Sequence, residues 1–312
     1  MLKNVSGWLG RSLGYLLYGI GVLALLLWLL FPKETVRRSL EEVLGSMWPE
    51  LRWQVGTVAL AMPARLTLRA IEGYRKGEDR SPLVQVSELT LHPHVGESLR
   101  TRTMVVGYRM TVDKGSVAGS VRILGRHKGL EVEGTARELR LADVPLISRL
   151  LGRALQGAVS GTFTAGLVPP VKGGSVTLEA RLKVENGSLG LKRPILSHTE
   201  IPFSQGSVIL SGHGAILQLE QGVVESELFD GRFSGMISLH GDPVLSQLDV
   251  KGAMQPKNKF FKGLDNTVAL QAFRMQLKDN ALPFRITGDL SNPGIHYEGF
   301  AMLVQNLEKE LK

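Results

Sequence analysis

Hydrophobic and polar residues alternate with a period of two over most of the chain that follows residue 48. The clearest stretch is 175–184, whose apolar positions are Val176, Leu178, Ala180, Leu182 and Val184. Such alternation is typical of an antiparallel strand with one buried face and one solvated face. The dipeptide Asn186-Gly187 follows this stretch directly and predicts a type I′ hairpin turn, because both residues accept positive φ angles.

Similar alternation predicts many further strands with Gly, Asp and Asn breakers between them. These strands are expected at 83–91, 104–112, 117–124, 130–141, 159–167, 216–229, 232–240, 247–252, 268–277 and 283–290. Short strands at this spacing predict a mainly β protein built as a sandwich, a barrel or a long, curved, mostly antiparallel sheet with a few short helices. The densest Pro and Gly stretch, 168–174, predicts a seam within the β-rich body, 49–298.

Helical spacing interrupts the β pattern once, between residues 143 and 157. Asp143 is expected to be the N-cap, Pro145 fits the first turn, and Gly157 is the expected end of a helix of about three turns. A buried plug, a partner-binding helix and a crossover all fit this segment. Residues 299–312 predict a C-terminal helix or tail.

The most apolar segment of the chain is 13–31, which carries no charged side chain. As a helix it would span ~28 Å, close to the ~30 Å hydrocarbon core of a bilayer. No small-x-small cleavage site follows Phe31, so the segment predicts an uncleaved transmembrane anchor rather than a signal peptide, with the tail 1–12 in the cytoplasm. Lys and Arg counts on its two sides are nearly equal and do not fix the orientation. The anchor residues are Leu13, Tyr15, Leu16, Leu17, Tyr18, Leu23, Leu25, Leu26, Leu27, Trp28, Leu29, Leu30 and Phe31.

A short amphipathic helix is expected within the juxtamembrane segment 32–48, with Thr35 as N-cap and Gly45 near its end. Two readings of this helix are open. It could lie on the membrane surface with Arg37 and Arg38 toward the headgroups, or it could cap the end of the β structure. Its apolar stripe comprises Val36, Leu40, Val43, Leu44 and Met47.

Composition narrows the class of protein. The chain is 43% hydrophobic and 21% charged, which excludes a disordered chain and a polytopic transporter. Thirty-six glycines without a collagen period indicate turns and bulges. The absence of cysteine excludes disulfides, thiolate chemistry and cysteine-bound metals. The net charge of +8 is dispersed and forms no basic block, so it predicts surface charge and no nucleic-acid partner.

Catalytic motifs are missing from the sequence. It has no P-loop, no Gly-x-Ser-x-Gly and no His-Glu-x-x-His. His92 and His94 would lie ~7 Å apart on one face of an extended chain, but no third ligand is near in sequence, so we expect surface histidines. Glu225 and Glu227 are expected to be solvated. The sequence therefore predicts no catalytic, cofactor-binding or metal-ligating residue and no enzyme.

Several segments give the chain a family resemblance. The anchor ends in Leu-Leu-Phe-Pro, a short helix follows, and the body is long, glycine-rich and β-structured. In this the chain resembles protein N of the bacterial type II secretion system, the GspN family. The closing segment, with Gly-x-Leu-x-Asn-Pro at 288–293, is shared with the broader AsmA-like membrane-anchored β proteins. The segments that carry the resemblance are 139–163, 174–190, 227–242 and 284–297.

The resemblance implies a single-pass protein of the bacterial inner membrane whose β-rich body lies in the periplasm. It implies a non-enzymatic accessory or scaffold that contacts membrane lipid through its anchor and other secretion-system or envelope proteins through its body. The AsmA-like resemblance implies an alternative, a protein that carries acyl chains of a lipid ligand in an apolar β-groove. A filled inner face would favour the scaffold, and an apolar groove would favour lipid handling.

Overall fold

A computed structural model of the chain describes residues 15, 18, 19, 22, 26, 30–48, 50–61, 64–77, 81–124, 129–167, 176–195, 198–240, 245–261, 270, 271, 273, 275, 277, 281–299 and 302. Most of the predicted anchor 13–31, the seam 168–174 and most of the C-terminal segment 299–312 lie outside these residues. Within the described part of the chain, no helix combines the length and the apolar character needed to cross a membrane.

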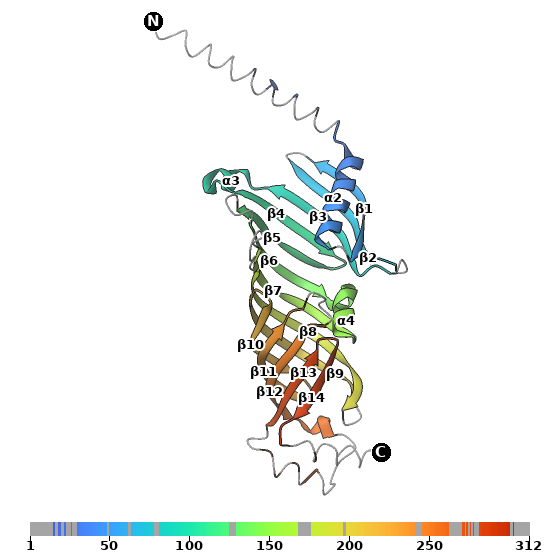
Figure 1. Cartoon of the computed structure of the whole chain (residues 1–312), viewed down its shortest axis with the longest axis vertical. Helices are drawn as coiled ribbons and strands as arrows, with labels where there is room; N and C mark the ends of the chain where they lie inside the picture. The colour runs from blue at the N-terminus through green and yellow to red at the C-terminus, as the bar shows by residue number, and fades with distance from the viewer. Residues whose placement is uncertain are drawn as a thin grey trace.

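In the part of the chain that the structure describes, fourteen strands form one antiparallel sheet, and each strand pairs with its neighbours in sequence. Figure 1 shows that this sheet is long and curved, which confirms the mainly β prediction. The strands are β1 (Leu51–Ala61), β2 (Arg65–Arg75), β3 (Val84–Pro93), β4 (Met104–Val112), β5 (Gly115–Leu124), β6 (Gly129–Arg140), β7 (Leu155–Leu167), β8 (Val176–Ile195), β9 (His198–His213), β10 (Ile216–Glu225), β11 (Phe229–Ser238), β12 (Gln247–Pro256), β13 (Leu282–Asp289) and β14 (Asn292–Tyr297).

The hairpin turn expected at Asn186-Gly187 is wrong, because β8 continues through both residues to Ile195. Asn186 does take a positive φ of 50°. The pairing of β7 with β8 shifts register at this point, between Gln156 and Ala158. The left-handed residue therefore makes a β-bulge inside a strand of 20 residues instead of a turn between two strands.

Two other predicted strands need correction. In the expected strand 268–277, the described residues Leu270, Gln271, Phe273 and Met275 are helical. A short apolar run fits both periods, and the spacing of Leu270 and Phe273 puts both buried side chains on one helix face. The expected strand 216–229 is divided into β10 and β11 by a turn at Ser226, whose backbone N–H donates to Phe229 O over 2.9 Å.

The α-helices whose bounds are described are α2 (Lys33–Met47), α3 (Val95–Thr101) and α4 (Pro145–Leu151), and short 3-10 helices cover Leu141–Asp143 and Asn258–Phe261. The helix predicted at 143–157 is shorter than expected. Val144 is its N-cap in place of Asp143, and Gly152, in the left-handed conformation, ends it before Gly157, which belongs to β7. Helix α2 begins after Pro32 and not at Thr35, and it continues past Gly45.

Helix α2 packs on the first strands and contributes to one of the two hydrophobic cores found among the described residues. Phe31, Val36, Leu40 and Leu44 contact a cluster of buried residues from β1 to β4 that includes Val55 and Leu68. The Val55 N–H also donates to the Glu41 carboxylate over 2.9 Å, so the helix is held by a polar contact as well. These contacts support the cap reading of the helix.

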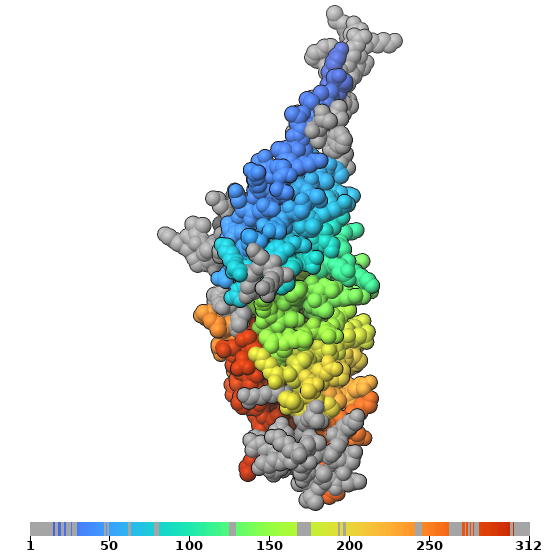
Figure 2. All heavy atoms as spheres, turned by 90° about the vertical axis from the view of Figure 1, so that its right-hand side faces the viewer, coloured from blue at the N-terminus to red at the C-terminus, as the bar shows by residue number. Residues whose placement is uncertain are grey.

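The C-terminal strands curl back toward the middle of the sheet. Lys192 Nζ of β8 donates to the carbonyl oxygen of Ser291, in the turn between β13 and β14, over 2.6 Å. Figure 2 shows the red C-terminal strands beside the green and yellow segments of the middle of the chain. Strands β8 to β14 therefore enclose a space on their concave side.

Candidate functional site

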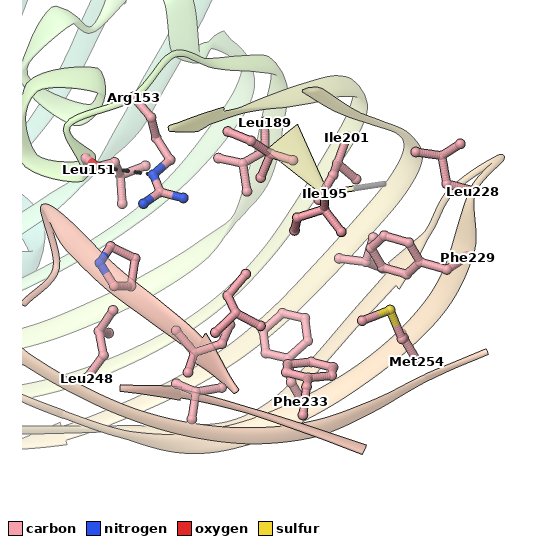
Figure 3. A pocket seen from close by; sticks show the side chains of 18 of the residues that line it. Leu151, Arg153, Leu189, Ile195, Ile201, Leu228, Phe229, Phe233, Leu248 and Met254 are labelled. Carbon is pink, nitrogen blue, oxygen red and sulfur yellow. Dashed lines mark hydrogen bonds between the residues drawn. The ribbon is translucent and has the colours of Figure 1, made fainter. Parts of the chain in front are cut away.

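An apolar cavity of about 380 Å³ occupies the space enclosed by β8 to β14. Its wall is formed almost wholly by Leu, Ile, Val, Phe, Met and Pro side chains (Figure 3). Arg153 and His198 are the two described lining residues with a charged or imidazole side chain. Its described lining residues include no cluster of polar side chains that could bind a polar ligand, so the cavity is suited to an apolar molecule.

The period-two pattern of the last strands produces this lining. In β11, Phe229, Gly231, Phe233 and Ile237 all lie on the cavity side. Leu248, Val250 and Met254 of β12, Phe284 and Ile286 of β13, and Ile295 and Tyr297 of β14 repeat the pattern. Alternate residues of a strand point to opposite faces, so these strands present one continuous apolar surface.

Polar residues of the same strands occupy the opposite, outer face. Arg285 of β13 donates from Nε and from one terminal nitrogen to the two carboxylate oxygens of Asp249 of β12, over 2.8 and 2.9 Å. The Arg285 guanidinium lowers the pKa of Asp249. Lys257 Nζ donates to Asp230 over 2.6 Å. The sheet thus keeps its ion pairs in solvent and its apolar side chains inward.

One end of the cavity adjoins an aromatic cluster formed by Phe260, Phe261 and Phe273 with Leu270 and Leu282, all of them buried. The ring centroids of Phe260 and Phe261 are 5.2 Å apart, and those of Phe261 and Phe273 are 5.5 Å apart. Phe260 also lines the cavity. Edge-on aromatic packing of this kind makes a dense wall at this end.

Leu151 and Arg153, at the end of α4, lie at the other end of the cavity. Figure 3 shows the Arg153 side chain directed into the cavity, on the side opposite Leu228, Phe229 and Met254. Arg153 Nε donates to Leu151 O over 3.3 Å, and no described carboxylate forms an ion pair with this guanidinium. Burial lowers the pKa of Arg153. The cavity therefore has one cationic end and one aromatic end.

The concave side of the sheet differs between its two halves. Over β1 to β4, the side chains of α2 fill it. Over β8 to β14, the apolar cavity occupies it. A filled inner face and an apolar groove, the two alternatives considered from the sequence, are therefore both present in one sheet.

The side chains singled out in the sequence lie elsewhere. Arg37 pairs with Glu34 over 2.8 Å and Arg38 is exposed, so their contact with a membrane stays a prediction. Glu225 and Glu227 are exposed, as expected, and Glu227 pairs with Lys259.

His92 and His94 are closer than the sequence suggested, with 3.0 Å between their Nε2 atoms, and His94 Nδ1 lies 3.4 Å from a Glu97 carboxylate oxygen. The described residues contain no group of three or more side chains arranged to hold a metal ion. Burial and the nearby cations His94, Arg65 and Arg109 lower the pKa of His92.

Sequence reasoning did not identify the cavity or Arg153. The apolar faces of β11 to β13 were visible as alternation, but alternation alone does not distinguish a packed face from one that encloses a space. Arg153 stands in the segment predicted as a helix, where a cation near a C-terminus is an ordinary feature. Its position in the cavity depends on the curl that brings Ser291 to Lys192.

Comparison of the chain with protein-family models, with curated proteins and with solved structures finds no match. The relationship to the GspN family and to AsmA-like proteins therefore stays a prediction from the resemblance of the sequence. The cavity is the feature from which a function can be argued.

Proposed function

We propose that this protein binds the acyl chain of a lipid in the cavity enclosed by β8 to β14. The observation that carries the proposal is the apolar lining of this cavity on all the strands that surround it. Water in such a space finds few hydrogen-bond partners, whereas an acyl chain loses its contact with water on entering. A volume of about 380 Å³ lies within the range of ~300–1,000 Å³ that is common for small-ligand sites.

The proposal places this cavity in a membrane-anchored protein. Residues 13–31 would form the single-pass anchor in the inner membrane and leave the sheet in the periplasm, an assignment supported by sequence alone. An anchored body could take up a lipid from the bilayer surface and hold it for transfer between envelope membranes. Because α2 fills the concave side over β1 to β4, a carrier that holds one chain fits better than a conduit along the whole sheet.

A photo-crosslinkable fatty acid tests the proposal in membranes that contain the full chain. We expect cross-links to peptides of β8 to β14, and we expect Leu248→Trp, which fills the cavity, to reduce them about tenfold. Leu99→Trp is the matched control, because Leu99 of α3 is 76% exposed and lies far from the cavity lining. Cross-links confined to residues 13–31, or unaffected by Leu248→Trp, would contradict lipid binding in the cavity.

A second candidate is the accessory role in type II secretion that the resemblance implies. The observation that favours it is an exposed apolar tip around α3, where a protein partner could bury hydrophobic surface. The tip comprises Val95, Leu99, Met104, Ile123 and Leu124.

Deletion of the gene tests this second candidate by loss of secreted exoproteins while the outer-membrane lipid stays intact. A complementing chain with Val95→Ser and Leu99→Ser would fail to restore secretion if the tip is the contact surface. A deletion strain with normal secretion would remove this candidate and would leave the lipid proposal standing.

A further inference from the structure

The end of α4 is fixed against the C-terminal strands, and this contact determines where Arg153 lies. Gly152 has a φ of 60°, and the Arg153 N–H donates back to Ser148 O over 3.1 Å, which closes the helix. A Cβ on Gly152 would stand 2.7 Å from Ser291 O, so the helix end meets the β13–β14 turn without room for a side chain. Arg153, the next residue, is therefore held at the end of the cavity that lies between α4 and this turn.

The surroundings of Arg153 are apolar. Leu151, two residues before it, lines the cavity beside it, and Leu189 of β8 pairs with Leu155 of β7 close by. Leu290 lines the cavity next to Ser291. The nearby cation Lys192 already donates to Ser291 O. No described residue supplies the guanidinium with a carboxylate.

Burying a guanidinium that makes one hydrogen bond costs free energy, unless a ligand accepts hydrogen bonds from its other N–H groups. Arginine has five N–H donors in a planar fork, and this fork matches the two oxygens of a carboxylate. Desolvation of a cation without an anion disfavours its charged form, and the pKa of Arg153 is lowered in this way. An anionic group at this end of the cavity would remove that cost.

We infer from these observations that the ligand is a long-chain fatty acid whose carboxylate pairs with Arg153 and whose tail points toward Phe260. This inference rests on the proposed lipid binding. The single charge of a carboxylate matches the single guanidinium. Among the described residues at this end, Arg153 is the charged side chain that lines the cavity, whereas Lys192 lies outside the lining and already donates to the Ser291 carbonyl oxygen. The aromatic cluster at the opposite end offers its apolar rings to the tail, and the His198 imidazole beside it already bonds to the Phe260 carbonyl oxygen over 3.2 Å.

Competition for a neutral, pyrene-labelled long-chain alcohol tests the inference with the full chain in nanodiscs. Palmitate and hexadecanol share a tail and differ in the head, so they separate recognition of the head from occupation of the cavity. We expect Arg153→Gln to raise the palmitate concentration needed for displacement about tenfold or more, and to leave displacement by hexadecanol unchanged. Unchanged hexadecanol binding also shows that the variant is folded.

Arg232→Gln is the matched control, because Arg232 lies on the outer face of β11 and is exposed. We expect it to bind both competitors as the unchanged chain does. Arg153→Lys should restore palmitate binding in part, because it keeps the charge and loses the fork.

Three results would overturn the inference. Equal displacement by palmitate from the unchanged chain and from Arg153→Gln would show that the head is not recognised, while lipid binding itself stands. Tighter, Arg153-dependent binding of lysophosphatidylglycerol than of palmitate would replace the carboxylate by a phosphodiester. Failure of every lipid to displace the probe, or of the probe to bind, would overturn the lipid proposal as well.

Discussion

The ring of Phe233 on β11 covers the backbone of Gly222, its register partner on β10, and occupies the place where a Cβ would stand. The same arrangement recurs across the sheet. Removing the side chain at one position gives the neighbouring ring a flat surface to pack on. The other pairs are Gly73 with Trp53, Gly134 with Phe163, Gly187 with Phe203 and Gly252 with Phe284.

Gly222→Ala should therefore move the ring of Phe233. The colliding atoms belong to the edge of the ring, which can rotate, and Phe233 lines the cavity. We expect a loss of ~1–3 kcal/mol in the free energy of unfolding, as for a typical overpacked position, and weaker binding of fatty acid. Chemical denaturation and the pyrene-probe titration measure the two effects. Unaltered probe binding would show that the ring of Phe233 does not move into the cavity.

Gly119→Ala should destabilise the sheet without changing ligand binding. A Cβ there would collide with the backbone of Glu133 and Gly134 on β6, which cannot rotate away. We expect a loss of ~1–3 kcal/mol in the free energy of unfolding. The matched control is Gly45→Ala in α2, where nothing lies within 4 Å and no positive φ is required. That change should stabilise the helix by up to ~1 kcal/mol, and a destabilisation there would contradict the packing of α2.

Leu40→Ala and Val43→Ala separate the two faces of α2. Leu40 packs on the first strands, and Val43 is 51% exposed. We expect Leu40→Ala to cost about 2 kcal/mol or more in the free energy of unfolding, and Val43→Ala to change it by less than ~0.5 kcal/mol. Thermal unfolding measures both.

Val43→Ala also tests whether α2 contacts the bilayer. If its outer face lies on the membrane surface, Val43→Ala should increase the exposure of this helix to a water-soluble modifying reagent in liposomes. No increase would leave α2 as a cap alone.

Phe260→Ala should lengthen the cavity at its aromatic end. Phe260 lines the cavity, and its ring also packs against Phe261 and Phe229. We expect a loss of ~3–5 kcal/mol in stability and a shift of preference toward longer fatty acids. Displacement of the pyrene probe by fatty acids of increasing length measures this preference. The milder variant Phe260→Leu keeps the chain folded if the alanine variant does not fold, and an unshifted preference in it would place the tail elsewhere.

Protonation of His92 should weaken the fold as the pH falls. The pKa of His92 is lowered below 6.5 by burial and by the cations His94, Arg65 and Arg109, so the unfolded chain binds the proton more readily. Its contribution is complete above about pH 6.5 and is lost as the pH falls through the pKa of the folded state. We expect His92→Gln to flatten the pH dependence of unfolding between about pH 7 and pH 5.

Titration of the His92 ring by NMR gives the pKa directly. The control is His94→Gln, which removes one of the neighbouring charges and should raise the pKa of His92 toward its ordinary value. A His92 pKa at or above 6.5 in the unchanged chain would contradict this account.

Local pattern was sufficient to predict many of the strands but not the enclosed space; no strand was predicted for β1, β2, β9 or β14, and the strand expected at 268–277 was wrong. The strand expected at 104–112 coincides with β4, because alternation and its turns are local properties. The Asn186 prediction failed because a positive φ fits both a turn and a bulge, and the choice depends on pairing with β7 and β9. The cavity depends on contacts such as that of Lys192 with Ser291, which lie far apart in sequence.

The strictly sequential order of the strands has a consequence for how the protein is assembled. Every strand pairs with the strand made just before it, so the sheet can grow hairpin by hairpin as the chain emerges, with little loop-closure entropy at each step. The Lys192–Ser291 contact, by contrast, joins residues 99 apart and must wait for β13 and β14. The sheet can therefore be largely complete while the cavity is still open, and we expect the cavity to close only after β13 and β14 have paired.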